Sequence, residues 1–316
     1  MLTFGPVPSR RLGRSLGINN IPPKICSYSC VYCQQGHSSK VQIERQTFYQ
    51  PEVIRDAVKE QVERAVAAGE PIDYLSFVPN GEPTLDVNLG REIDLLKPFN
   101  IPIAIITNAS LLWMPELRNE LARVDWVSVK IDSIHEPTWR RIDHPHRGLS
   151  LPLILEGIID FALHYQGILC TETMLVRGIN DQAAILEDTA RFIARLQPSV
   201  AYISIPTRPP ADRRVTPPDE ISLYSAYQIY RRYIAEVEYL IGPEDDTFTY
   251  TADLEKDLLS TASVHPMRAD AVKKLLKKAG RDWDVIERLI KDGQLIELDF
   301  EGQRFYLRKL LDQRQR

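Results

Sequence analysis

Short apolar, β-prone runs alternate along the chain with longer stretches whose apolar residues recur every three or four positions. This alternation is typical of βα units, which build a parallel sheet covered by helices. The apolar runs predict six strands, at residues 16–20, 73–78, 102–107, 126–131, 169–176 and 201–206. Helices are predicted between and after them, at residues 51–68, 115–123, 151–166, 181–196 and 218–240. The pattern therefore predicts an α/β fold built on a curled parallel sheet.

The pattern changes after Thr251, where the βα alternation stops. An apolar stretch begins at Leu254, short helices are predicted at 268–279 and 282–291, and alternating apolar and polar residues predict two strands joined at Glu301-Gly302, at 294–300 and 303–308. Two short helices followed by a β-hairpin resemble a winged helix-turn-helix.

We therefore divide the chain into a barrel domain of residues 1–250 and a winged-helix-like domain of residues 251–316. The second of the two short helices begins with the acidic residues Asp282 and Asp284. A helix that reads DNA presents hydrogen-bond donors to phosphates and base edges at this place. The small domain is accordingly expected to recognise a protein or a substrate in preference to duplex DNA.

Chemically distinctive residues follow the C-terminal ends of the predicted strands, where βα units gather their functional groups. These residues are the cysteine loop after the first strand, Asn80-Gly81-Glu82-Pro83 after the second, Thr107-Asn108 at the end of the third, Lys130 and Asp132 at the end of the fourth, and Ile203 to Pro206, running into Thr207-Arg208-Pro209-Pro210, at the end of the sixth. Since the strands run parallel, all of these residues are expected at one rim of the sheet.

The cysteine loop contains Cys26, Cys30 and Cys33 in a C-x3-C-x2-C spacing. Thiolates are soft ligands, and three of them on a tight loop suit three corners of a cubane iron–sulfur cluster, which leaves the fourth iron open for chemistry. Spacing alone also allows a structural zinc site, with His37 as the fourth ligand, or a disulfide. Cys170 lies apart in an apolar stretch and is expected to be a buried small hydrophobe.

Composition limits the alternatives. The chain has 316 residues, 44% hydrophobic and 26% charged, which fits a soluble globular protein with one large and one small domain. The net charge of −4 argues weakly against attraction of the whole protein to nucleic acid. The N-terminus lacks the apolar run of a signal peptide, and no stretch approaches the roughly 18 apolar residues of a membrane span. A reducing, cytoplasmic setting without membrane contact is therefore expected.

The cysteine spacing, the aromatic Tyr32 before Cys33 and the Gly81-Glu82-Pro83 element together resemble the radical S-adenosylmethionine (radical SAM) superfamily. The resemblance implies a partial (β/α)6 TIM-like barrel and two cofactors, a [4Fe-4S] cluster and SAM. It also implies an electron donor such as ferredoxin or flavodoxin. In such enzymes one electron cleaves SAM, and the 5′-deoxyadenosyl radical that results abstracts hydrogen from a substrate. A structural zinc site, the alternative occupant of the cysteine loop, would not account for the motifs at the ends of the other strands.

The same resemblance implies roles for individual residues. Cys26, Cys30 and Cys33 would hold the cluster, and Gly81, Glu82 and Pro83 would bind the SAM amino group, for which carboxylate or carbonyl acceptors are suited. The SAM ribose and carboxylate would contact Thr107, Asn108, Lys130 and Asp132. Lys130 stands where the family often has serine, and would neutralise the SAM carboxylate or a substrate anion. Tyr32, Ile203 and Ile205 would provide the adenine surface.

Within the superfamily, the run FGPVPSRRLGRSLGINNIPPKICSYSCVYCQ and the motifs NGEPTL, TETMLVRGIND and PTRPP resemble tRNA wyosine-synthase-like iron–sulfur oxidoreductases, over roughly residues 3–250. True wyosine synthases carry further cysteines upstream for a second cluster, whereas no cysteine precedes Cys26 here. The sequence therefore predicts a one-cluster enzyme and leaves its substrate open, either an RNA base or a small metabolite. Two alternatives remain, a maturase that modifies a protein or peptide recognised by the C-terminal domain, and a nucleic-acid-binding protein with a structural metal site.

Overall fold

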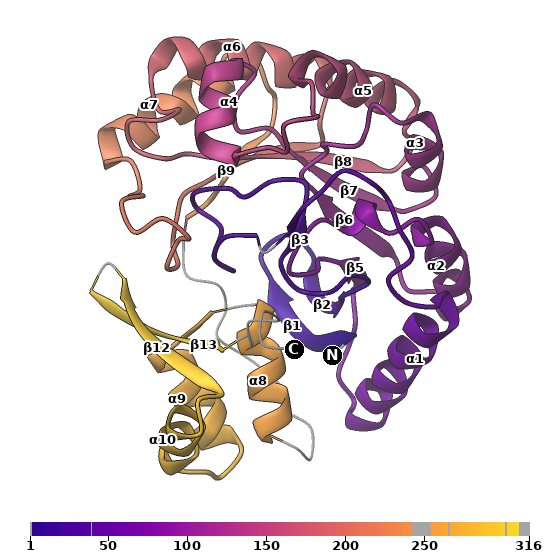
Figure 1. Cartoon of the computed structure of the whole chain (residues 1–316), viewed down its shortest axis with the longest axis vertical. Coiled ribbons are helices and arrows are strands. Elements are labelled where there is room, and N and C mark those ends of the chain that lie inside the picture. Colours follow the sequence, from indigo (N-terminus) through magenta and orange to yellow (C-terminus); the bar gives the residue numbers. More distant parts are fainter. Residues whose placement is uncertain (1, 39, 242–253, 265, 301, 310–316) are drawn as a thin grey trace.

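The fold of the chain is taken from a computed structural model, which describes residues 2–38, 40–241, 254–264, 266–300 and 302–309. Eight strands form a curled sheet in the order β1-β2-β5-β6-β7-β8-β9-β10, and helices cover its outer side (Figure 1). Their bounds are β1 Thr3–Ser9, β2 Gly13–Ile18, β5 Tyr74–Phe77, β6 Ile103–Thr107, β7 Trp126–Lys130, β8 Ile168–Met174, β9 Val200–Ser204 and β10 Val237–Leu240. The prediction of an α/β partial barrel is confirmed.

All six predicted strands are present and pair in parallel in chain order, as β2, β5, β6, β7, β8 and β9. Two further strands extend the sheet at its edges. β1 pairs antiparallel with β2, and β10 pairs parallel with β9. Among the described residues, β1 and β10 do not pair with each other, so the barrel is open on that side.

The helix predicted over residues 218–240 is wrong in its second half. Helix α7 covers Glu220–Arg231, and the chain then turns into β10. Val237 and Leu240 are buried in this strand, which hydrogen-bonds along β9. Pairing with an exposed sheet edge therefore outweighs a helical periodicity that spans both segments.

The remaining helices lie between the strands, and the predicted ones are confirmed to within a few residues. Helix α1 (Pro51–Ala68) has Pro51 in its first turn and ends at Gly69, whose φ of 68° lies in the left-handed region. The others are α2 Leu89–Leu96, α3 Pro115–Leu121, α4 Glu136–Asp143, α5 Leu151–His164 and α6 Ala183–Arg195, with two short 3₁₀ helices, η1 Pro83–Leu85 and η2 Lys97–Phe99. No helix of the described residues is both long and apolar enough to cross a membrane.

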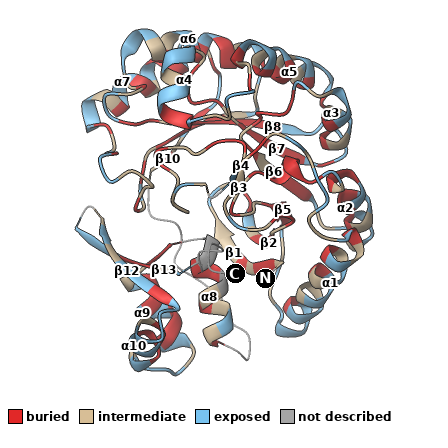
Figure 2. Cartoon of the chain, in the orientation of Figure 1, coloured by how far each residue is buried: buried red, intermediate tan, exposed pale blue. Residues whose placement is uncertain are grey.

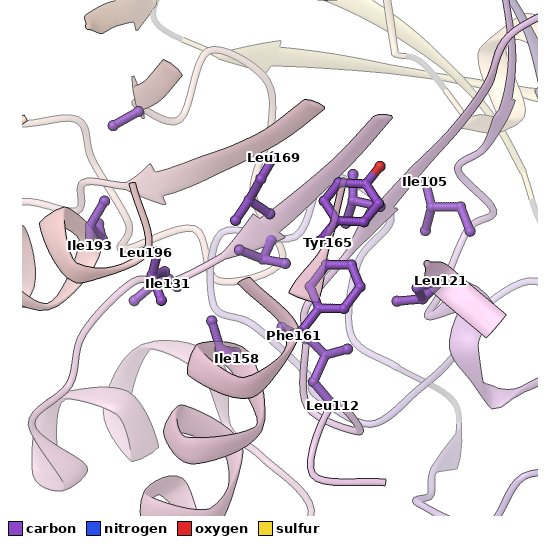
Figure 3. Packing of buried hydrophobic residues seen from close by; sticks show 14 of the residues in the cluster. Ile105, Leu112, Leu121, Ile131, Ile158, Phe161, Tyr165, Leu169, Ile193 and Leu196 are labelled. Atoms are coloured by element: carbon purple, nitrogen blue, oxygen red, sulfur yellow. The ribbon is translucent and has the colours of Figure 1, made fainter. Parts of the chain in front are cut away.

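The main hydrophobic core lies between the sheet and the outer helices. Buried residues are concentrated in the strands and on the helix faces that turn toward them (Figure 2). Phe161 and Tyr165 of the α5 region stack with ring centroids 4.8 Å apart, close to Leu112 and Ile158 (Figure 3). One set of strand side chains points outward into this core. Because successive side chains point to opposite faces of a strand, the other set faces the barrel interior.

A second apolar layer fills part of the barrel interior. It consists of Leu12, Ala104, Trp126, Cys170, Tyr202 and Leu240. Cys170 is 1% exposed and packs in this layer, which confirms that it is a buried hydrophobe. The interior is therefore closed by apolar side chains on one side of the polar residues described below.

The C-terminal elements form a second sheet in the order β11-β13-β12, with three helices and a hydrophobic cluster of their own. They are α8 Leu254–Val264, β11 Met267–Arg268, α9 Ala269–Lys278, α10 Asp284–Lys291, β12 Leu295–Phe300 and β13 Gln303–Arg308. The predicted helices and the hairpin are confirmed. Glu301 and the boundary placed at residues 250–251 lie outside the described residues. Val7 of β1 packs against the C-terminal cluster.

Glu92 of α2 is a buried carboxyl group with incomplete hydrogen bonding. Asn20 Nδ2 donates to its Oε2 at 3.2 Å, whereas Oε1 has no partner among the described residues. Burial, with a smaller contribution from Asp86, raises the pKa of Glu92 to about 8. The folded protein therefore binds more protons than the unfolded chain between about pH 4.5 and pH 8.

Stability is accordingly expected to fall as the pH rises through this window, by about 3 kcal/mol from pH 5 to pH 8 for this group alone. Glu92→Gln removes the cost of ionisation, so the variant should gain on the wild type at pH 8 and little at pH 5. Urea unfolding of both proteins at the two pH values measures this. An equal difference at pH 5 and pH 8 would contradict the assignment.

Candidate active site

A cavity of about 420 Å³ lies at the C-terminal ends of the parallel strands. All three cysteines of the loop line it, so the structure brings the predicted cluster ligands together. Seven of the ten other predicted site residues also line it, namely Tyr32, Gly81, Glu82, Thr107, Asn108, Lys130 and Ile205. Pro83, Asp132 and Ile203 are absent from the described lining. The strand ends thus converge on one site, as the parallel topology predicts.

The cysteine loop is held by short-range and long-range backbone contacts. Cys26 belongs to β3 (Ile25–Cys26), which pairs in parallel with β4 (Lys40–Val41). Cys33 N donates to Cys30 O at 3.1 Å, forming a turn, and Val31 N donates to Ile142 O at 2.9 Å. The second contact anchors the loop on helix α4. The spacing of the thiols is therefore fixed by the backbone.

The three thiols fit an iron–sulfur cluster by their chemistry. They are free cysteines, and burial raises the pKa of each of them above its ordinary value. Three sulfur ligands buried together become stable thiolates when a positive metal centre balances their charge. His37, the alternative fourth ligand of a zinc site, is exposed and absent from the described lining. Among the described residues, no three His, Cys, Asp or Glu side chains are grouped for a single metal ion.

The Asn80-Gly81-Glu82 segment packs directly on the first cysteine strand. Lys24 N donates to Asn80 O at 2.6 Å, and Glu82 N donates to Ile25 O at 3.1 Å. A Cβ on Gly81 would lie 1.9 Å from Ile25 O, so only glycine allows this approach. The glycine of this motif is thus required by the contact between the two loops.

Glu82 connects the ends of two strands. Its Oε1 accepts from Thr84 Oγ1 at 2.7 Å and Thr107 Oγ1 at 2.6 Å, and its Oε2 accepts from Asn108 N at 2.8 Å. Asn108 Nδ2 in turn donates to Ser27 Oγ at 2.8 Å and lies 3.5 Å from Cys26 Sγ. Burial raises the pKa of Glu82, although these donors act in the opposite direction. Glu82 and Asn108 therefore shape the rim and position the cluster loop.

The Tyr32 hydroxyl contacts two acidic side chains, neither of which is in the described lining of the cavity. It donates to Asp132 Oδ2 and lies 3.2 Å from Asp143 Oδ1. Asp132 Oδ1 also accepts from Met174 N at 2.7 Å, so its oxygens are occupied within the protein. Burial and the neighbouring Asp132 raise the pKa of Asp143 well above its usual range. The geometry makes Asp132 an anchor for the Tyr32 ring and offers no support for a contact with a cofactor.

Ile203 and Ile205 both contact the core between sheet and helices, but only Ile205 also lines the cavity. Ile203, inside β9, is fully buried in the core between sheet and helices. Ile205, just after the strand ends, lines the cavity. Ser204, between them, faces the cavity from inside the barrel. Alternation would place both isoleucines on the same face, so Ile205 reaches the cavity because β9 ends at Ser204, one residue before it.

The sequence interpretation missed a charged group that lines the cavity. Glu172 of β8 accepts from Arg11 Nη1 at 2.6 Å and from Ser204 Oγ at 2.9 Å, and it lies 3.5 Å from Lys130 Nζ. Burial opposes its ionisation, but Lys130 and Arg11 outweigh this effect and lower its pKa to about 2. Its signal in the sequence is a carboxylate between two threonines, in a strand whose other residues are apolar.

A scan of protein-family models matches residues 20–193 to the radical SAM superfamily. UPF0026 protein MJ1312 of Methanocaldococcus jannaschii is 44% identical over 98% of this chain and 96% of its own length. A probable GTP 3′,8-cyclase of Thermococcus kodakarensis is 26% identical over 49% of this chain and 46% of its own.

Among solved structures, a radical SAM methyltransferase from Sphaerobacter thermophilus matches with a TM-score of 0.56 at 16% identity, covering 74% of this chain and 68% of its own. This similarity concerns the fold. The matched family model covers more than half of the chain and includes the three cysteines. The chain therefore belongs to the radical SAM superfamily, whose enzymes use a [4Fe-4S] cluster and S-adenosylmethionine.

Proposed function

We propose that this radical SAM enzyme holds a single [4Fe-4S] cluster on Cys26, Cys30 and Cys33 and uses it with SAM to abstract hydrogen from a substrate in the same cavity. The observation that carries this is the convergence of three free thiols and the strand-end residues on one cavity. The fourth cysteine, Cys170, packs in the apolar interior layer, which leaves three thiols for one cluster. When bound, the two cofactors supply a carbon-centred radical, with the electron coming from a donor such as ferredoxin or flavodoxin.

The residues of the rim divide the work of binding SAM. The Asn80-Gly81 turn lines the cavity, and its backbone carbonyls would serve as acceptors for the ammonium group. Lys130 is one of the cations that line the cavity and would contact the SAM carboxylate. Tyr32 and Ile205 present apolar surface for the adenine. Glu82, Thr107 and Asn108 hold this rim in place through their mutual hydrogen bonds.

The experiment is anaerobic reconstitution with iron and sulfide, followed by reduction with dithionite in the presence of SAM. We expect 5′-deoxyadenosine to form only when protein, reductant and SAM are all present, and chromatography with mass spectrometry measures it. Protein reconstituted without iron is the control. A reconstituted cluster that never cleaves SAM under reduction would refute the proposal.

For the substrate we favour a nucleotide, an RNA base or another small metabolite. The relative named probable GTP 3′,8-cyclase supports this class, since its name denotes a nucleotide substrate. One observation supports the second candidate, a maturase that acts on a protein or peptide. Val7 of β1 lines the cavity and also packs against the C-terminal cluster, so the C-terminal elements lie close to the site.

Protein purified anaerobically from its native host distinguishes the two candidates. Bound nucleotides, RNA or metabolites would support the first, and a bound polypeptide would support the second. The winged-helix-like interpretation of the C-terminal elements predicts that such a polypeptide contacts this part of the chain, which chemical cross-linking can test.

A further inference from the structure

Glu172, which has no role in the proposed function, is the centre of a group of charged residues inside the barrel. It lies in β8, and its side chain is 12% exposed. Its Oε2 binds Arg11 at 2.6 Å, and its Oε1 accepts from Ser204 and lies 3.5 Å from Lys130. A carboxylate with donors on both oxygens has little freedom to move, because any rotation breaks at least one charge-assisted contact.

Arg11 is itself fixed from the opposite side. It belongs to the turn between β1 and β2, and its guanidinium lies 6.0 Å from the ring centroid of Trp126 and 5.9 Å from that of Tyr202. Both rings belong to the apolar interior layer. Stacking on aromatic rings suits the planar guanidinium and restricts its orientation. The position of Glu172 is therefore tied to the rigid interior of the barrel.

Lys130 lies at the other end of this chain of contacts. Its ammonium is 3.5 Å from Glu172 and 4.6 Å from the ring centroid of Tyr32. A lysine side chain has four rotatable bonds and loses rotamer entropy when it is fixed. With Glu172 on one side and the Tyr32 ring on another, this entropy is lost before a ligand binds.

We propose that Glu172, fixed by Arg11 and Ser204, is a positioning residue that holds the Lys130 ammonium in place for the SAM carboxylate and thereby sets the affinity for SAM. This inference rests on the proposed function, in which Lys130 contacts SAM. The direction in which the affinity for SAM changes when Glu172 is removed distinguishes two effects. By charge alone, a carboxylate beside Lys130 repels the carboxylate of SAM, so its removal would tighten binding. By positioning, its removal weakens binding.

The test is a double-mutant cycle on SAM affinity, measured by anaerobic equilibrium dialysis with radiolabelled SAM and reconstituted protein. Reductant is omitted, so SAM is not consumed. We expect Glu172→Gln and Lys130→Met each to raise the dissociation constant about tenfold. The double variant should bind SAM no more weakly than Lys130→Met alone, because Glu172 acts through Lys130.

Glu187→Gln is the matched control. Glu187 pairs with Arg191 at 2.7 Å on the outer helix α6, so the same chemical change is made at another ion pair outside the cavity. We expect its affinity for SAM to equal that of the wild type. Iron content and melting temperature are measured for every variant. Loss of SAM binding that follows loss of iron or of folding would indicate a structural role and overturn the proposal.

The inference is also overturned if Glu172→Gln binds SAM as tightly as the wild type or more tightly, if Lys130→Met leaves the affinity unchanged, or if the two effects add in the double variant. Formation of 5′-deoxyadenosine is measured on the same wild-type preparation. It distinguishes failure of the positioning role of Glu172 from failure of the proposed function. A wild type that cleaves SAM but gives an additive cycle refutes only the positioning role. A wild type that binds iron but does not cleave SAM refutes the proposed function.

Discussion

Replacing any one of Cys26, Cys30 and Cys33 with alanine is expected to abolish 5′-deoxyadenosine formation and to lower the iron bound after reconstitution. Each of these thiols lines the same cavity, and the loop that carries them is held at Ile142 by a backbone hydrogen bond of 2.9 Å. Mutation of a residue that only hydrogen-bonds a metal ligand already lowers the metal affinity or the activity of an enzyme about 10- to 100-fold. We therefore expect the loss of a ligand to lower the rate at least about a hundredfold.

Cys170→Ala is the control for this series, because Cys170 is the one remaining cysteine of the sequence and is buried in the apolar layer. Its iron content and 5′-deoxyadenosine yield should match those of the wild type, measured by iron assay and mass spectrometry. If replacement of one loop cysteine left iron content and activity at the wild-type level, the assignment of that cysteine as a ligand would be contradicted.

Gly81→Ala is expected to destabilise the protein by about 3 kcal/mol and to reduce cluster incorporation. The added Cβ would lie 1.9 Å from Ile25 O and 2.9 Å from Ile21 Cδ1. The first of these atoms belongs to the backbone of β3, the strand that carries Cys26, so relief of the clash requires movement of the cluster loop. Urea unfolding measures the loss of stability, and the iron assay measures the displacement.

Gly178→Ala provides a comparison with a different physical cause. Gly178 has a φ of 69°, and nothing lies within 4 Å of an added Cβ. Its replacement should cost about 1 kcal/mol, the conformational penalty of a left-handed alanine, and leave the iron content unchanged. If Gly81→Ala were no more destabilising than Gly178→Ala and bound iron normally, the close approach of the two loops would not be essential.

The predicted parts of the fold are those in which local pattern and tertiary structure agree. Helix α1 matches its prediction at both ends because Pro51 and Gly69 mark its boundaries in the sequence. The segment after α7 was misassigned because Val237–Leu240 is too short to show its own periodicity. Its strand conformation depends on hydrogen bonds to β9, a partner that local pattern does not reveal.

The candidate site shows the same division. The cysteine spacing and the strand-end rule locate the cavity, and seven of the ten other predicted residues line it. Asp132 and Ile203 differ because the direction of a side chain depends on register and on nearby donors. The hydroxyl of Tyr32 and the Met174 amide occupy the carboxylate of Asp132, and alternation along β9 turns Ile203 into the core.

Periodicity and ligand spacing are local properties of a chain, so the order of the βα units and the three thiols on a loop after the first parallel strand could be predicted from the residues alone. The arrangement of the charges inside the barrel depends instead on contacts between distant segments. Arg11 and Glu172 lie 161 residues apart and meet at 2.6 Å. Such a contact arises from the curling of the open sheet, which brings the turn after β1 against β8, and no local pattern contains that information.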